Sequence, residues 1–212
     1  MIFNLSSGKK SQIIVTADTG STVTCSKGTT VKTANEENGT WTFVGLSLGT
    51  WTITATSANG NTKTKTVTFE KHSTAYVEIV YDHIVFKSGS GFVNGHSYSV
   101  GGSIIHTVNA SKIHVEGTSQ SNWGYFNITP KTNLTKYSKL VLTVSVTWVG
   151  SNGGVKIGVG TATNTDSMAA SRTIGYHGGT LSIDISNVNT SAYILIDPLY
   201  CDVDITSIKL EA

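Results

Sequence analysis

Aromatic and planar polar side chains lie close together at one point in the C-terminal half of the chain. Asn122, Trp123 and Tyr125 fall within four residues, with Gln120 just before them. An aromatic ring can pack on the apolar face of a sugar ring, and amide side chains can hydrogen-bond with its hydroxyl groups. Trp123 follows Ser119-Gln120-Ser121, which places it at the end of a loop or the start of a strand. The cluster predicts a sugar-binding site, and the alternative is that Trp123 packs in the core.

A second candidate group lies in the longest segment without a strand pattern, residues 162–179. It contains Arg172, Tyr176 and His177, and Arg172 is the only arginine in the chain. Long loops on a rigid β scaffold often carry binding residues, so we expect this segment to contribute to a ligand site. A salt bridge that anchors the loop would explain Arg172 equally well.

The residues offer little support for catalysis. Asp202 and Asp204 share one strand face and could form a cation site or a carboxylate pair, as glycoside hydrolysis requires. No other acidic residue lies near them in sequence, which favours an ordinary solvated strand face. The six histidines show no spacing typical of a zinc site, and no Gly-x-Ser-x-Gly motif fits a nucleophile turn. We therefore predict a non-enzymatic protein without a metal site or cofactor.

Composition excludes several partners. Charged residues make up 13% of the chain, against about 25% in typical soluble domains, and the net charge is +2. The basic residues are scattered, so we expect no nucleic-acid partner. No apolar run approaches the ~20 residues that span a bilayer, and the N-terminus shows no signal-peptide pattern. Cys25 and Cys201 alternate in phase with neighbouring apolar residues, so we predict that both pack in a core without forming a disulfide.

Alternating Thr and apolar residues dominate the chain. In residues 39–56, Trp41, Phe43, Trp51 and Ile53 stand between threonines, so one strand face is apolar and the other carries hydroxyl groups. No amphipathic helix is visible, and the pattern predicts an all-β protein. Residues 1–82 form the first predicted domain, with strands near Ile13–Ala17, Thr22–Ser26, Thr40–Val44, Thr50–Ser57, Thr62–Glu70 and Thr74–Tyr81.

Residues 83–212 form the second predicted domain, after a boundary region near 82–95 rich in Gly and Ser. Val203 and Ile205 alternate out of phase with Ile208 and Leu210, which predicts a bulge at Thr206-Ser207. About eight strands in this length are typical of a jelly roll. The predicted strands are Ser103–Val108, Lys112–Glu116, Tyr125–Thr129, Lys139–Val149, Gly154–Gly160, Leu181–Ile185, Ala192–Ile196 and Cys201–Leu210.

The segment Gly39-Thr-Trp-Thr-Phe-Val-Gly-Leu-Ser-Leu-Gly-Thr-Trp-Thr-Ile53 carries a resemblance to a known family. Residues 11–81 resemble the Ig-like or prealbumin-like sandwiches of the carboxypeptidase-regulatory type. With the preceding Val23–Thr29, they also resemble versions found in phage tail proteins. The resemblance implies an Ig-like β-sandwich that acts as a spacer or stalk.

The C-terminal part carries a second resemblance. It rests on Asn133–Leu140 leading into a long strand, on Gly158-Val159-Gly160, on Thr180–Val188 and Tyr193–Ile196, and on the closing Ile205–Leu210. Residues 83–212 resemble the galactose-binding-like jelly rolls at the C-termini of phage tail and baseplate proteins. Many relatives of this fold bind sugars, although a fold does not establish a function.

Together, these resemblances imply a structural protein of a phage tail or baseplate, made in the host cytoplasm and localised in the virion. Its expected partners are other virion proteins in a homo-oligomer of unspecified copy number, and a host cell-surface polysaccharide bound by the jelly roll. The alternative is a fragment of a bacterial cell-surface adhesin or carbohydrate-binding module. No nucleic-acid or membrane partner is expected.

Overall fold

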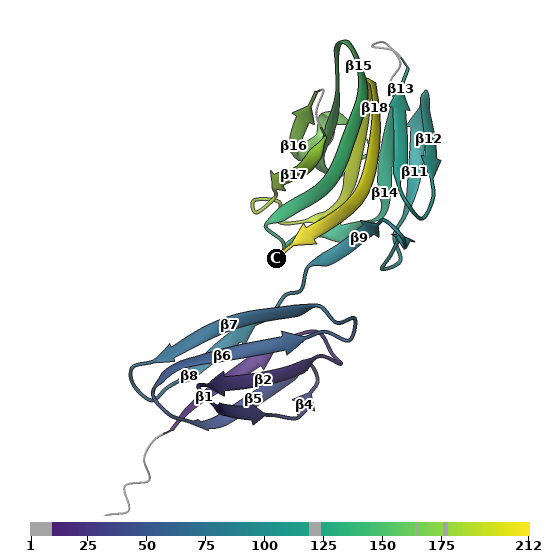
Figure 1. The fold of residues 1–212 in the computed structure, drawn as a ribbon. Helices are drawn as coiled ribbons and strands as arrows, with labels where there is room; N and C mark the ends of the chain where they lie inside the picture. Colours follow the sequence, from purple (N-terminus) through teal and green to yellow (C-terminus); the bar gives the residue numbers. More distant parts are fainter. Residues whose placement is uncertain (1–9, 119–123, 164, 176–177) are drawn as a thin grey trace, which may run out of the picture. The chain divides into compact units, whose positions relative to one another are not determined.

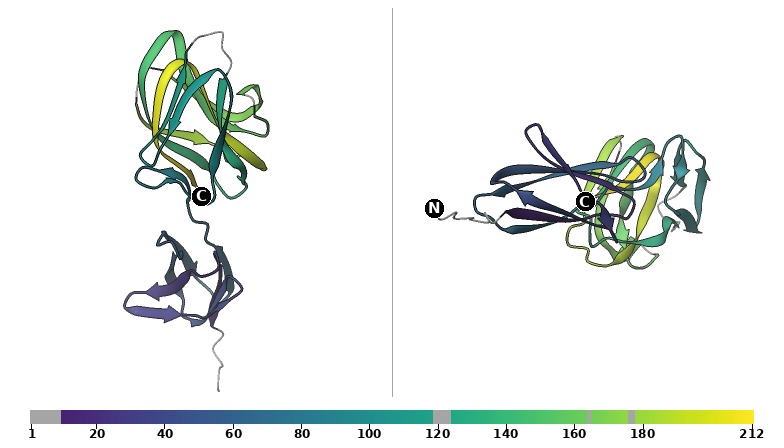
Figure 2. Two further views of the ribbon diagram at one scale, coloured as in Figure 1. Left: turned by 90° about the vertical axis from the view of Figure 1, so that its right-hand side faces the viewer. Right: turned by 90° about the horizontal axis from the view of Figure 1, so that it is seen from below.

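The computed structural model describes residues 10–118, 124–163, 165–175 and 178–212, with backbone only for 148–152 and Thr165. The chain divides into two compact units between Tyr81 and Asp82. Apart from one 3-10 turn, η1 (Thr165–Ser167), every regular element in these residues is a β-strand, and the strands of each unit form two layers (Figures 1 and 2). The predicted all-β fold, an Ig-like sandwich followed by a jelly roll, is confirmed.

Unit 1 consists of two four-stranded sheets, ordered β4-β5-β1-β8 and β3-β2-β6-β7. All pairs are antiparallel except β1 with β8, which is parallel. The short β3 and β4 were not predicted, because they are largely exposed and lack an apolar alternation. The strands are β1 (Ser11–Thr16), β2 (Thr22–Lys27), β3 (Thr30–Thr33), β4 (Glu36–Glu37), β5 (Thr40–Leu46), β6 (Gly49–Thr56), β7 (Thr62–Phe69) and β8 (Thr74–Glu78).

The Thr alternation produces the core of unit 1 as expected. Trp41 and Phe43 on β5 and Trp51 and Ile53 on β6 are at least 98% buried. The threonines between them lie on the opposite faces and are partly or fully exposed. Burial of each aromatic ring contributes on the order of 2–3 kcal/mol to stability. The period-2 pattern therefore determines which face of each sheet enters the core.

Unit 2 is a jelly-roll-like sandwich whose two layers share their longest strands. Sheet I consists of β17, the first half of β15, the second half of β18, then β13 and β9, with β12 and β10 outermost. Sheet II has the order β16, second half of β15, first half of β18, β14 and β11. The strands are β9 (His83–Lys87), β10 (Gly91–Phe92), β11 (Ser97–Gly102), β12 (Ile104–Val108), β13 (Ile113–Gly117), β14 (Gly124–Asn133), β15 (Lys139–Gly160), β16 (Met168–Ile174), β17 (Gly179–Asp184) and β18 (Ser191–Glu211).

Strands β15 and β18 pass from one sheet to the other. Each was predicted as two separate strands, and each is continuous in the structure. Their pairing shifts register between Val149 and Gly154, opposite Tyr200, whose φ is 50°. The bend interrupts the side-chain alternation without ending the backbone pairing, which is why the sequence pattern resembles a strand break. The predicted bulge near Thr206 is confirmed, since Thr143 pairs with Ser207 and Val144 with Ile205.

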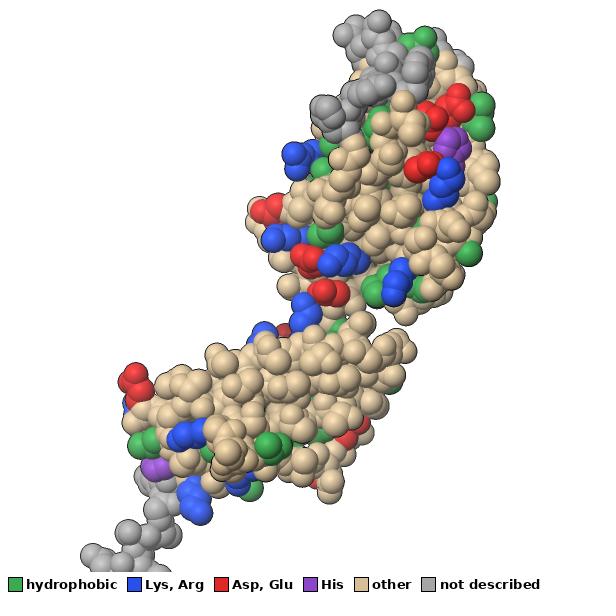
Figure 3. Space-filling view, in the orientation of Figure 1, with side chains coloured by type: hydrophobic (Ala, Val, Ile, Leu, Met, Phe, Trp, Pro, Cys, Tyr) green, Lys and Arg blue, Asp and Glu red, His purple; other side chains and the backbone are tan. Residues whose placement is uncertain are grey.

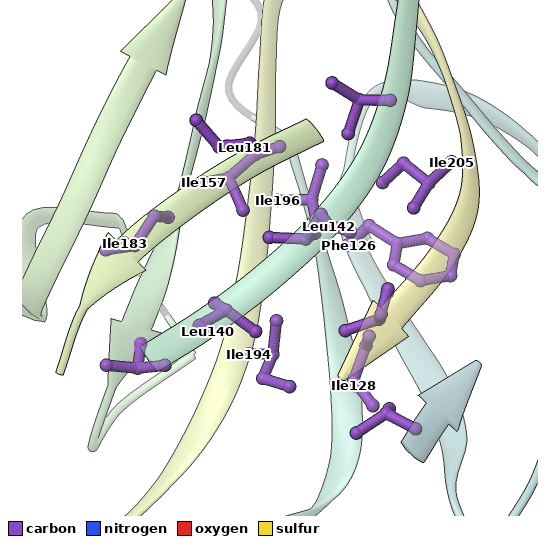
Figure 4. Packing of buried hydrophobic residues seen from close by; sticks show 14 of the residues in the cluster. Phe126, Ile128, Leu140, Leu142, Ile157, Leu181, Ile183, Ile194, Ile196 and Ile205 are labelled. Atoms are coloured by element: carbon purple, nitrogen blue, oxygen red, sulfur yellow. The ribbon is translucent and has the colours of Figure 1, made fainter. Parts of the chain in front are cut away.

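Facing side chains from the two sheets fill the core of unit 2. Figure 4 shows Phe126 and Ile128 of β14 pointing toward Leu142 of β15 and the β18 residues Ile194 and Ile205. Cys201 lies in this core and Cys25 in the core of unit 1, and both are free, as predicted. Burial raises the pKa of the Cys25 thiol to about 11 and that of Cys201 to about 12. Both thiols are therefore packed as small apolar groups.

Candidate functional site

Tyr125 stands at the start of β14, on the face of sheet II that points away from the core. Its neighbour Phe126 is fully buried, so alternation places the Tyr125 side chain outward, where it is half-buried. A Cβ atom on Gly101, the β11 residue paired with Tyr125, would lie 2.3 Å from Tyr125 Cζ. The ring therefore lies across the neighbouring strand, in space that only a glycine leaves free. Gln120, Asn122 and Trp123, predicted with Tyr125, lie outside the described residues.

Pairing across the five strands of sheet II defines the surrounding surface, which we call the Tyr125 face. Across the sheet, Asp197 of β18 pairs with Lys156 of β15, and Lys156 pairs with Thr173 of β16. Because Phe126 pairs with Ile196, Tyr125 lies at the β14 end of this row of residues. Asn127 lies in the next row on the same face. The face combines two aromatic rings, small residues and polar side chains. Its members are Ser97, Ser99, Gly101, Tyr125, Asn127, Thr129, Lys156, Gly158, Gly160, Ser171, Thr173, Tyr193, Leu195 and Asp197.

Asn127 is the most unusual residue of this face. Its side chain is fully buried, and neither its Nδ2 nor its Oδ1 atom has a hydrogen-bond partner among the residues that the structure describes. Buried amides are nearly always paired, because an unpaired one costs about 1–3 kcal/mol. Leu195, its pair on β18, is also fully buried although it points away from the core. The Asn127 amide therefore has both a donor and an acceptor available for a buried water molecule.

A turn covers one side of this face. A Cβ atom on Gly160 would lie 2.9 Å from both Leu195 Cδ1 and the Ser167 carbonyl oxygen, so η1 packs over β15 and β18 here. Beside it, Lys131 Nζ lies 5.0 Å from the centre of the Tyr193 ring, within cation–π range. These contacts orient Tyr193, the second ring of the Tyr125 face.

Arg172 lies on a strand, which corrects the prediction that 162–179 is one long loop. Residues Met168–Ile174 form β16, a largely exposed edge strand whose sequence lacks the regular apolar alternation of a core strand. Its partner in the register is Ile157, a core residue, so the Arg172 position faces the interior side of the sheet edge. Tyr176 and His177 lie outside the described residues.

Arg172 borders a cleft of ≈ 370 Å³ at the edge of the sandwich, between β16 and β17. In sheet II, β15 and β18 lie between β16 and β14. The axes of β16 and β14 are therefore about 14 Å apart. Tyr125 also points to the opposite side of the sheet. The two predicted groups therefore do not form one site.

Asp202 and Asp204 lie on the outward face of sheet I, beside residues of β13 that sequence reasoning did not connect with them. His114 Nδ1 is 2.7 Å from Asp204 Oδ1 and 3.3 Å from Asp202 Oδ1. Lys112 Nζ donates a hydrogen bond of 2.7 Å to Asp204 Oδ2. Figure 3 shows this mixture of acidic, basic and His side chains over β13 and β18. The expected plain solvated face is instead a cross-strand ion-pair network, which we call the His114 cluster.

The His114 cluster has the donor set of a cation site, since His114, Asp202 and Asp204 offer ligand atoms within 4.8 Å of one another. However, Lys112 already supplies a positive charge to Asp204 and would compete with a metal ion. Partial burial alone would raise the pKa of Asp204, but hydrogen bonds from Lys112 and His114 outweigh it and hold the pKa below its usual value. Lys112 and His114 therefore stabilise the negative charge of Asp204 without a metal ion.

A histidine pair lies elsewhere in unit 2. His83 Nε2 and His96 Nε2 are 2.7 Å apart, so one ring donates a hydrogen bond to the other. Burial lowers the pKa of both, and the neighbouring His96 lowers that of His83 further. The two residues are 13 positions apart, and no spacing rule in the sequence predicts their contact.

The described part of the chain contains no helix long and apolar enough to cross a bilayer.

Comparison with known proteins gives structural similarity only. No family model and no curated protein matches the chain. Among solved structures, a point mutant of CBM29-2, a family 29 carbohydrate-binding module, is 14% identical over 62% of this chain and 92% of its own, with a TM-score of 0.46. The family 11 module from Clostridium thermocellum, in complex with a β-1,3-1,4-mixed-linked tetrasaccharide, is 13% identical over 63% and 97%, with a TM-score of 0.42. At such identities, the matches assign no site residues.

Proposed function

We propose that this chain is a non-enzymatic polysaccharide-binding protein, and that its C-terminal sandwich binds sugar through the Tyr125 face. The observation that carries the proposal is the partly exposed Tyr125 ring lying across Gly101, in a face that also contains the Tyr193 ring. A ring supported by the sheet beneath it loses little conformational freedom on binding, and it offers a surface to the apolar side of a pyranose.

A glycosidase would need more than this face contains. Hydrolysis requires two carboxyl groups on either side of the glycosidic bond, one as acid and one as base or nucleophile. Among the described residues of the Tyr125 face, Asp197 is the one carboxylate, and Lys156 stands opposite it on β15. With this one carboxylate, the Tyr125 face supports binding of a polysaccharide without its cleavage.

We place this role first in a bacterial cell-surface adhesin or carbohydrate-binding module. The virion tail or baseplate role, with its protein partners and homo-oligomer, has only the sequence resemblance in its favour. Polysaccharide binding is the part that both roles share and that the Tyr125 face supports. Neighbouring genes would separate the roles, since tail genes favour the virion and a cell-wall anchor favours the adhesin.

The test of binding is Tyr125→Ala against a panel of polysaccharides, measured by affinity electrophoresis and calorimetry. A ring stacked on one sugar contributes about 1 kcal/mol, so the variant should bind about five-fold more weakly or worse. Tyr76→Ala is the matched control, because Tyr76 in unit 1 is 78% exposed. Its loss should leave affinity unchanged.

Circular dichroism and thermal unfolding must show that Tyr125→Ala keeps the fold. Equal affinity of the variant and the wild-type protein would exclude the Tyr125 face as the site. A wild-type protein that binds no member of a broad panel would remove the proposed function altogether.

A further inference from the structure

The cleft at the β16–β17 edge has the form of a small-ligand site. It opens where sheet II ends in β16 and sheet I ends in β17, and Val144, Ile174 and Leu181 form its apolar part. Val144 and Leu181 belong to the core of unit 2 and are at least 95% buried, so this part of the cleft is rigid. Its volume of ≈ 370 Å³ falls at the lower end of the usual range for ligand pockets and suits one or two sugar units.

Arg172 supplies the charge of this cleft. Its side chain is exposed, and no hydrogen bond, ion pair or ring contact joins it to any other residue that the structure describes. No acidic side chain is among the described residues that line the cleft. The salt bridge considered from the sequence is therefore absent in the described residues, and the five N–H donors of the guanidinium are available.

We propose that this cleft binds the carboxylate of an acidic sugar, with Arg172 as the residue that recognises it. A guanidinium and a carboxylate match as two parallel charge-assisted hydrogen bonds, which a neutral sugar cannot form. Ile174, which is partly exposed, offers an apolar contact to the sugar ring, and Thr180 adds a polar group to the lining. The sugar class rests on the proposed polysaccharide binding, while the anion site rests on Arg172 and the cleft alone.

The probe pair is polygalacturonate and its fully methyl-esterified form, which share a backbone and differ in charge. The wild-type protein should bind polygalacturonate more tightly than the ester. Arg172→Ala should weaken binding of polygalacturonate ten-fold or more and leave binding of the ester unchanged. Arg172→Lys keeps the charge but not the paired donors, and it should recover only part of the affinity.

Two further variants separate the cleft from general charge. Gly175→Leu places a side chain beside the cleft, at a glycine where a Cβ atom meets no other atom within 4 Å. It should weaken polygalacturonate binding with Arg172 intact. Lys87→Ala removes one exposed positive charge from β9 and should have no effect.

Each outcome decides one proposal. Equal binding of polygalacturonate by Arg172→Ala and the wild-type protein, or loss on Lys87→Ala, would overturn the anion site. Competition by inorganic phosphate at concentrations where galacturonate fails to compete would assign the cleft to phosphate and refute the carboxylate. Failure of the proposed function gives a different result: Tyr125→Ala would leave binding of neutral polysaccharides unchanged, whatever Arg172 does.

Discussion

The outward faces of the two sheets in unit 2 differ in whether their polar side chains are paired within the protein. On sheet I, each carboxylate oxygen of Asp204 accepts a hydrogen bond, one from Lys112 and one from His114. On sheet II, the fully buried Asn127 amide has no hydrogen-bond partner among the described residues for either of its polar atoms. The charged groups of the His114 cluster are thus paired with one another, whereas the Asn127 amide is not.

This difference shows how a binding surface can be recognised in a chain with few charges. Groups paired within the protein contribute to its stability, and groups left unpaired cost stability that a ligand can recover. The His114 cluster should therefore matter for folding and the Tyr125 face for binding. Four substitutions or changes of condition test this contrast.

Gly101→Val should have the largest effect. A Cβ atom at this position would overlap the Tyr125 ring, so the ring must leave its place on β11. Crowding of this kind costs typically about 1–3 kcal/mol, and displacement of the ring should reduce polysaccharide affinity to the level of Tyr125→Ala. Urea unfolding and calorimetry measure the two effects. Full affinity in a destabilised variant would show that the position of the ring on Gly101 is irrelevant to binding.

Asn127→Val should raise stability and leave binding unchanged. Valine is close in size to asparagine and suits a strand, and it removes a buried amide without partners. We expect the free energy of unfolding to rise by about 1 kcal/mol. Polysaccharide affinity should stay unchanged, because the Asn127 side chain is fully buried. Denaturant titration and affinity electrophoresis test both. A variant that is less stable than the wild-type protein would mean that the amide serves the fold, through a buried water molecule.

Asp204→Asn should cost stability and leave binding unchanged. The pKa of Asp204 is lowered in the folded protein, so its contribution is present above the usual pKa of 3.8 and is lost as the pH falls below that value. At neutral pH the loss should be about 1 kcal/mol or less, because the pairs are partly exposed. Unfolding curves between pH 7 and about pH 3 should converge for the variant and the wild-type protein. Weaker polysaccharide binding would remove the contrast between the two faces.

The His83–His96 pair should have the smallest effect, which appears only on acidification. Both pKa values are lowered in the folded protein, so the unfolded chain takes up protons first as the pH falls below about 6.5. Stability should therefore decline between about pH 7 and pH 5, and His96→Gln should reduce the decline. The melting temperature measured across this range checks it. An equal slope in both proteins would show that the pair does not titrate in this range.

Several features of the fold follow from the order of residues. The alternation around Trp41 and Trp51 assigns core and surface faces, because successive side chains of a strand point to opposite sides. The change of phase after Ile205 indicates the bulge at Thr206, and the phase of Cys25 and Cys201 places both in the cores. These are local properties, which a strand expresses wherever it is placed.

The order of residues thus predicts that the chain is all-β, where most strands run and which face of each is apolar. It also indicates Tyr125 and Arg172 as candidate binding residues. The fold is needed to show that these two lie on different sides of sheet II and that His114 joins Asp202 and Asp204. It also shows that Asn127 is buried without a partner among the described residues. The physical reason is that these relations depend on which strands are neighbours in a sheet. Strand neighbours are set by contacts between residues far apart in the chain, and alternation within one strand carries no information about them.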